Sequence, residues 1–133
     1  MDLSLRLAEG ELAVVRLGPR AGTPEWLDWS ARPLVSVTVT DDEMSVVCPA
    51  GDVPAGVRSE GPWRAFRIEG TIDFALTGVL ASVLNPLAAA EIGIFALSTF
   101  DTDWILVRAE SVDAAAAALS AQFRVYGVEP IGG

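Results

Sequence analysis

The chain has 133 residues, of which 51% are hydrophobic and 20% are charged. This length allows one domain, or two very small domains that pack as a unit, and the apolar fraction excludes intrinsic disorder. Nine arginines face eighteen Asp and Glu residues, which gives a net charge of −9. Nucleic acid and membrane surfaces are therefore not expected as partners, because both require a basic protein face.

The residue types that the chain lacks exclude several kinds of catalysis. It has no His, no Lys and one cysteine, Cys48. Ser–His–Asp and Cys–His mechanisms, Schiff-base catalysis, an internal disulfide and a thiolate zinc site are therefore excluded within one chain. We expect a protein that is not an enzyme and has no cofactor or metal. The single cysteine fits a reducing compartment, and residues 1–10 lack the apolar core of a signal peptide, so we expect a cytoplasmic protein.

The first half of the chain predicts strands and loops without a long helix. Residues 12–17 form a β-rich run, and residues 34–40 alternate strictly, with three valines on one side and Ser and Thr on the other. This period of two is typical of a half-buried strand. Residues 44–48 are expected to return as its hairpin partner, and the Gly- and Pro-rich residues 49–61 predict a loop.

The second half alternates between the periods of strands and helices. Residues 63–69 predict a strand. Apolar residues then recur with helical spacing at Leu76, Val79, Leu80, Val83, Leu84 and Leu87. This spacing predicts a helix of about four turns, with Asp73 or Thr71 as its cap. Pro86 is expected to kink or tighten its last turn, and Gly93 lies near its expected end.

The remaining elements complete a recognisable order. Residues 94–99 and 104–107 predict a strand pair, Ser111 is expected to cap a helix over 112–122, and residues 123–128 predict a closing strand. From residue 63 the order is thus strand, helix, strand, strand, helix, strand. This βαββαβ order is typical of a ferredoxin-like sandwich, in which two helices pack on one side of an antiparallel sheet.

The first half of the chain predicts a reduced copy of the same order, with a loop in place of the first helix. The predicted fold class is therefore α+β, with two ferredoxin-like modules, antiparallel sheets and helices on one side. The N-terminal, reduced module is expected over residues 1–61 and the complete module over residues 62–133.

Two polar segments have the chemistry to hold a small ligand. Backbone N–H groups at the start of the helix after Asp73 attract carboxylates. In residues 98–103, Thr99, Asp101 and Asp103 could bind an amine or a guanidinium through charge-assisted hydrogen bonds. Together the two segments complement an amino acid. Each also has a structural interpretation, because Asp73 could serve only as a helix cap and residues 98–103 only as a solvated turn.

Other polar residues are better explained by structure. Ser36, Thr38 and Thr40 could face a ligand, but one wet face is normal for an antiparallel strand. The acidic residues 41–43 lack the spacing of a calcium-binding loop. Cys48 has no basic neighbour in the sequence and is expected to be a buried strand residue rather than a nucleophile.

Several short motifs together resemble one protein family. They are Ser36-Val-Thr38, Asp41-Asp-Glu43, Glu69-Gly-Thr-Ile-Asp-Phe74, Thr77-Gly-Val-Leu-Ala-Ser82 and Ile94-Phe-Ala-Leu-Ser-Thr-Phe-Asp-Thr-Asp103. In these segments the chain resembles small bacterial ACT-domain proteins. Such proteins are similar to the regulatory part of aspartate kinases and to CASTOR-type arginine sensors. The resemblance extends from about Leu5 to Val128.

The resemblance implies a tandem ACT arrangement, often dimeric, that binds an amino acid between its modules. It implies contacts from the loop and helix start after the first strand of the complete module, and from the strand and turn opposite. Thr99, Phe100 and Asp103 match positions with which the arginine sensors hold their ligand, and Ser36 is added from the first module. The implied ligand residues are Ser36, Asp73, Phe74, Leu76, Thr77, Gly78, Val79, Ser98, Thr99, Phe100 and Asp103.

We therefore expect a non-enzymatic regulatory or sensor protein that binds a small molecule and forms a homodimer. The expected small molecule is an amino acid. The alternative is a structural or protein-interaction protein that keeps the same fold and dimerises without a ligand. The absence of both His and Lys favours binding over chemistry in either case.

Overall fold

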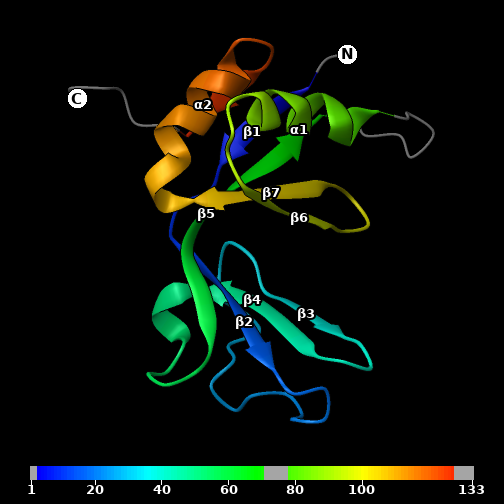
Figure 1. The fold of residues 1–133 in the computed structure, drawn as a ribbon, viewed down its shortest axis with the longest axis vertical. Helices are drawn as coiled ribbons and strands as arrows, with labels where there is room; N and C mark the ends of the chain where they lie inside the picture. Colours follow the sequence, from blue (N-terminus) through cyan, green and yellow to red (C-terminus); the bar gives the residue numbers. More distant parts are fainter. Residues whose placement is uncertain (1–2, 71–77, 128–133) are drawn as a thin grey trace. The chain divides into compact units, whose positions relative to one another are not determined.

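The computed structural model describes residues 3–70 and 78–127 of the chain. Its strands are β1 (Ser4–Leu7), β2 (Leu12–Leu17), β3 (Ser36–Val39), β4 (Met44–Pro49), β5 (Ser59–Glu69), β6 (Ile94–Ser98), β7 (Asp103–Arg108) and β8 (Arg124–Tyr126) (Figure 1). Its helices are α1 (Val79–Ala89) and α2 (Val112–Ser120), with short 3₁₀ turns at η1 (Ala50–Asp52) and η2 (Ala109–Ser111). Within the described ranges, neither helix has both the length and the apolar character that crossing a bilayer requires.

These elements form two compact units, which we describe separately. One unit comprises Met1–Glu9 and Arg64–Gly133, and the other comprises Gly10–Trp63. We expected modules over residues 1–61 and 62–133. The structure divides the chain two residues later, inside β5, and it assigns the first nine residues to the C-terminal unit.

Strand β1 explains why the start of the chain belongs to the C-terminal unit. It pairs antiparallel with the end of β5, where Leu5 is opposite Ile68, and parallel with β8, where Leu5 is opposite Val125. The strand order in this unit is β8-β1-β5-β7-β6. Leu3, Leu5 and Leu7 alternate with polar residues, so the strand can bury one complete face in the core of this unit.

The inserted strand also changes the expected sheet type. We expected a wholly antiparallel sheet, but β1 and β8 run parallel. The reason is geometric. In the expected fold the closing strand, β8, runs antiparallel to β5. Because β1 also runs antiparallel to β5, β8 must be parallel to β1. Close approach at this point requires a glycine, because a Cβ added to Gly127, which has a φ of +83°, would lie 2.5 Å from the carbonyl oxygen of Leu7.

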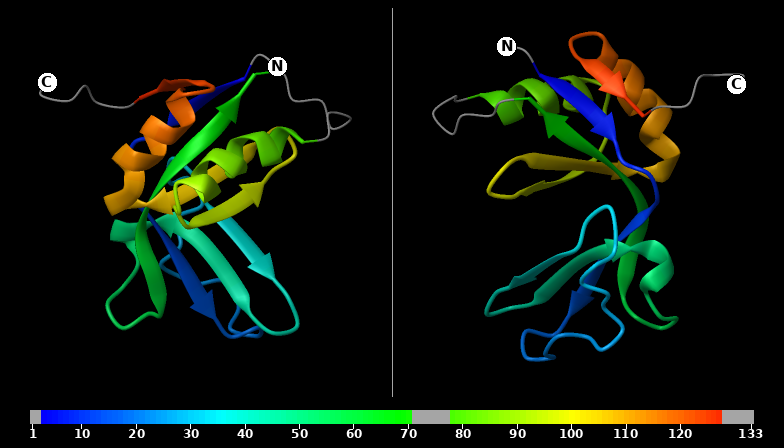
Figure 2. Two further views of the ribbon diagram at one scale, coloured as in Figure 1. Left: turned by 45° about the horizontal axis from the view of Figure 1, so that its top comes forward. Right: turned by 180° about the vertical axis from the view of Figure 1, so that it is seen from behind.

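Both helices cover one face of the C-terminal unit's sheet (Figures 1 and 2). The periodic apolar residues of α1 enter the core as Val79, Val83 and Leu87, and α2 contributes Ala115, Ala116 and Leu119. They pack against Leu5, Leu7, Phe66, Ile68, Ile105 and Val107 from the strands. The predicted order of strands and helices in this half is confirmed, and the structure shows an α+β unit with a sheet and two helices.

The predicted cap of α2 is only half correct. Ser111 does stand immediately before the helix, but its side chain makes no capping hydrogen bond. Its φ of −101° and ψ of 2° differ from the extended conformation that directs a serine hydroxyl toward the first helical N–H groups. The 3₁₀ turn η2 leads directly into the helix and replaces that conformation.

Helix α1 continues through Pro86 to Ala89, and Glu91 closes it before Gly93, which lies near the expected end. The N–H of Glu91 donates to the carbonyl of Ala88 at 3.0 Å, and the N–H of Ile92 donates to the carbonyl of Leu87 at 2.9 Å. These two bonds define a Schellman-type ending, in which one residue adopts the left-handed conformation. That residue is Glu91, whose φ is +60°.

Replacing Glu91 by glycine should therefore stabilise the protein. Glycine adopts this φ without steric cost, and the expected gain is about 0.5–1 kcal/mol in the free energy of unfolding. Urea unfolding followed by circular dichroism measures it. Glu91→Ala is the matched control, because it removes the same charge without relieving the backbone, and an equal gain in that variant would contradict the explanation.

The N-terminal unit is a small sheet in the order β3-β4-β2-β5. One face buries a core of Ala13, Val15, Leu27, Met44, Val46 and Cys48, with Trp26 packed against it. The long connection between β2 and β3 supplies Trp26 and Leu27, which cover this core in place of a helix. Val35 and Val37 pack on this core as the alternation predicts, whereas Val39 at the end of the edge strand is 59% exposed.

Cys48 lies in β4 and is fully buried, as expected for a structural cysteine. Burial raises the pKa of its thiol to about 11, and the nearby carboxylate of Asp52 adds to the shift. A thiol with such a pKa is almost entirely protonated at neutral pH, so it is a poor nucleophile.

Candidate functional site

The β6–β7 hairpin holds most of the predicted ligand residues that the structure describes. Ser98 and Asp103 are paired across the last step of the ladder, and the Ser98 hydroxyl donates to Oδ1 of Asp103 in a short hydrogen bond. Asp103 shares one face of β7 with the core residues Ile105 and Val107. The alternation of a strand therefore places the Asp103 carboxylate on the face that the helices cover.

The turn of this hairpin is closed by its own two threonines. The N–H of Thr99 donates to the carbonyl of Thr102 at 2.8 Å. The N–H of Thr102 in turn donates to Oγ1 of Thr99 at 3.3 Å, and that hydroxyl donates to the carbonyl of Thr102 at 3.2 Å. The side chain of Thr99 is thus part of the turn itself. Phe100, at the tip, is 85% exposed.

Thr102 fastens the turn to the end of β5. Thr102 is a buried polar residue, with 8% of its surface exposed. Its hydroxyl donates to the carbonyl of Ile68 at 2.6 Å. Ile68 lies one residue before the end of β5, after which the chain continues toward α1. Thr102 lies in the predicted polar turn, but nothing in its local sequence pattern indicates a bond to a residue 34 positions earlier.

Removing this hydroxyl should loosen the turn. Thr102→Val keeps the shape of the side chain but leaves the Ile68 carbonyl without its donor, which costs about 1–2 kcal/mol in the free energy of unfolding. Chemical denaturation measures the loss. Thr102→Ser retains the hydroxyl and should keep most of the stability; if it loses as much as the valine variant, packing of the methyl group and not the hydrogen bond is responsible.

The N-terminal end of α1 lies on the same side of the C-terminal unit as the β6–β7 turn (Figures 1 and 2). Gly78 precedes the helix with a φ of +84°, a left-handed conformation that favours glycine, and its carbonyl accepts from the N–H of Ser82 at 2.9 Å. Val79, the first helical residue, is buried in the core. It is therefore a packing residue of the site rather than a polar contact.

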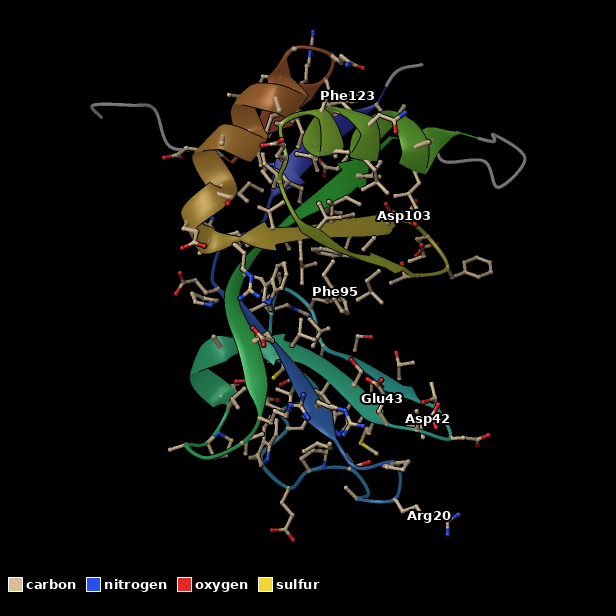
Figure 3. All side chains as sticks on the ribbon, in the orientation of Figure 1. Arg20, Asp42, Glu43, Phe95, Asp103 and Phe123 are labelled. Carbon is tan, nitrogen blue, oxygen red and sulfur yellow. The ribbon has the colours of Figure 1, made fainter. Side chains whose placement is uncertain are left out.

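The predicted ligand residues are distributed unequally. The structure brings Ser98, Thr99, Phe100 and Asp103 together in the β6–β7 hairpin, and it places Gly78 and Val79 at the start of α1. Figure 3 labels Asp103 in this hairpin. Ser36 belongs to β3 of the other unit. The four remaining predicted residues, Asp73, Phe74, Leu76 and Thr77, lie outside the described residues.

The chemistry of the hairpin is that of a carboxylate with a hydroxyl beside it. Such a pair can accept hydrogen bonds from an ammonium or guanidinium group. In the described ranges, no group of three His, Cys, Asp or Glu side chains is arranged to hold a metal ion. The acidic tip at Thr40–Glu43 is instead closed by its own bonds, in which the N–H groups of Asp42 and Glu43 donate to the Thr40 hydroxyl.

Comparison with known proteins identifies the family. A family model of the ACT domain matches residues 58–121, and a second model, of an N-terminal domain, matches residues 10–56. The protein Atu0741 of Agrobacterium tumefaciens is 35% identical in sequence, with coverage of 98% of this chain and 96% of that one and a TM-score of 0.87. The chain belongs to the ACT-domain family. No curated protein gives a significant sequence match.

More distant structures share the fold. A protein of unknown function from Vibrio cholerae has a TM-score of 0.73 at 18% identity, over 90% of this chain and 89% of that one. The ligand-free regulatory subunit of aspartate kinase from Thermus thermophilus has a TM-score of 0.63 at 15% identity, over 93% of this chain and 98% of that one. The resemblance to aspartate kinase regulatory domains that the sequence motifs indicate is thus confirmed at the level of the fold.

Proposed function

We propose that this protein is a non-catalytic regulatory protein that binds a free amino acid at the β6–β7 turn and the start of α1. The observation that carries the proposal is the position of Asp103. Its carboxylate lies on the helix-covered face of the hairpin, and the turn beside it is fastened to the end of β5 by the bond between Thr102 and Ile68.

The two ends of such a ligand would meet complementary groups. A cationic amine would be held by the carboxylate of Asp103, with the Ser98 hydroxyl as a second polar group. The α-carboxylate would be held by the N–H groups at the start of α1, where the helix dipole also favours negative charge. Neither interaction needs a metal, a cofactor or a reacting side chain.

The proposal includes a cytoplasmic homodimer as the working form of the protein. Binding regulates only if the ligand favours one state of the protein, or of its complex with a partner, over another. Both an altered dimer equilibrium and an altered partner affinity satisfy this requirement.

The second candidate is a structural ACT protein that dimerises without a ligand. The specific observation in its favour is that the polar groups of the turn satisfy one another. Ser98 donates to Asp103, and Thr99 exchanges hydrogen bonds with Thr102. A turn closed in this way is stable without a bound molecule.

Titration calorimetry of the purified protein against each of the twenty amino acids separates the two candidates. The proposal expects saturable heat with one amino acid or a few related ones, and loss of that heat when the α-amino group is replaced by hydrogen. Silence with all twenty would overturn the proposal and leave the structural candidate. Native mass spectrometry of the same sample reports the dimer independently.

A further inference from the structure

The sheet face that points away from the helices in the C-terminal unit carries a group of exposed arginines. Along β1, β5 and β8 the residues that alternate with the core positions include Arg6, Arg67, Arg124 and Tyr126. We call these four residues the arginine face. They include three of the nine basic residues of a chain whose net charge is −9.

The pairing of the strands sets two of these charges against each other. In the β1–β5 register Arg6 is directly opposite Arg67, and like charges in this position destabilise a sheet. Glu69 is the one acidic residue that the described parts of these three strands place on this face. Its Oε1 accepts from Nε of Arg6 at 3.1 Å, whereas Arg67 has no ion-pair partner among the described residues.

Aromatic rings hold the guanidinium groups in position. The Arg6 guanidinium carbon lies 5.2 Å from the centre of the Tyr126 ring, and that of Arg67 lies 5.9 Å from the centre of the Trp104 ring. Arg124 donates to the Tyr126 hydroxyl at 3.5 Å. Contacts of this kind attract a guanidinium group to the ring, and its planar shape means that it loses little conformational freedom when it forms hydrogen bonds.

We propose that the arginine face is a docking surface for an acidic, carboxylate-rich segment of a partner protein. Guanidinium groups bind carboxylates through paired hydrogen bonds, and such a segment would relieve the repulsion between Arg6 and Arg67. The surface is distinct from the turn that holds Asp103, so the proposal does not depend on amino-acid binding.

Charge also decides against the other anionic partners. Nucleic-acid binding relies on neutralising many phosphates, which three arginines on a strongly acidic chain do not achieve. A symmetric contact between two copies would place one arginine face against another and add to the repulsion. A short acidic polypeptide segment matches both the sign and the small number of the charges.

The test uses the full chain and a fluorescently labelled octapeptide that alternates Glu and Thr, read by anisotropy at low salt. The proposal expects saturable binding, no binding of the matching Gln–Thr peptide, and about tenfold weaker binding by the double variant Arg6→Gln/Arg67→Gln. The control variant Arg20→Gln/Arg58→Gln removes two exposed charges from the other unit and should bind as the unchanged protein does. Because the altered side chains are exposed, the melting temperature of each variant should stay within about 2 °C.

Four results would overturn the proposal. The first is the absence of binding by the unchanged protein. The second is an equal loss of binding in the control variant, which would reduce the effect to net charge. The third is tighter binding of a single-stranded oligonucleotide of the same charge than of the acidic peptide. The fourth is a change of oligomeric state in the Arg6→Gln/Arg67→Gln variant during sedimentation, which would make the face a contact between copies.

Discussion

Leu5→Ala should destabilise the C-terminal unit by about 3–5 kcal/mol. Leu5 is fully buried in the core of that unit and is flanked by Ile68 on one neighbouring strand and Val125 on the other. Truncating a leucine in such a position removes its transfer free energy and leaves a cavity between strands that are fixed on both sides. The expected loss is a large share of the total stability of a small domain.

Hydrogen exchange shows which unit carries this loss. In Leu5→Ala the amides of α1, α2 and β7 should lose protection first, although the mutated residue lies more than 70 positions before α1. Val46→Ala is the matched control, because Val46 is equally buried in the core of the N-terminal unit. It should expose β2, β3 and β4 first. If Leu5→Ala instead opened β2 and β4 before the helices, the first strand would belong with the N-terminal unit.

Asp103→Asn should abolish most amino-acid binding while the protein stays folded. The substitution removes the charge that the proposed site offers to an amine but keeps an oxygen that can accept from the Ser98 hydroxyl. Loss of a charge-assisted hydrogen bond predicts binding that is weaker by about 10–100-fold. Calorimetry with the amino acid that binds the unchanged protein measures the affinity, and thermal unfolding checks the fold.

Asp101→Asn is the control for Asp103→Asn, because Asp101 lies in the same turn and is exposed. It removes the same charge a short distance away and should change the affinity little, since exposed charges are screened by water and salt. Equal losses in the two variants would mean that the turn attracts cations in general and that Asp103 makes no specific contact.

The local features of the fold follow closely from the sequence. The period of two in residues 34–40 and the helical spacing that ends at Leu87 depend on neighbours within four positions. The described part of the chain has β3 (Ser36–Val39) and α1 (Val79–Ala89) in these regions. The order of strands and helices after residue 63 therefore identified the fold class. The polar segment 98–103 was likewise visible as a candidate site before any pairing was known.

Three features could be decided only by contacts between distant residues. Strand β1 pairs with partners that are 59 or more positions away, so its Leu-Arg-Leu alternation, although visible, did not indicate which sheet it joins. The bond from Thr102 to Ile68 spans 34 positions. The closure of α1 after Ala89 by a left-handed Glu91 depends on the bond from Ile92 back to Leu87, although glycine is preferred in that conformation.

In this chain, composition and periodicity were enough to exclude several kinds of catalysis and to predict most of the strands and helices. Its composition excluded His- and Lys-dependent catalysis, and its periodicity defined the strands and helices, because both properties are local. Tertiary structure alone decided that the first strand completes the C-terminal sheet and that Arg6 stands opposite Arg67. The physical reason is that strand register depends on which face of the whole strand is buried. Only the complete core shows which face that is.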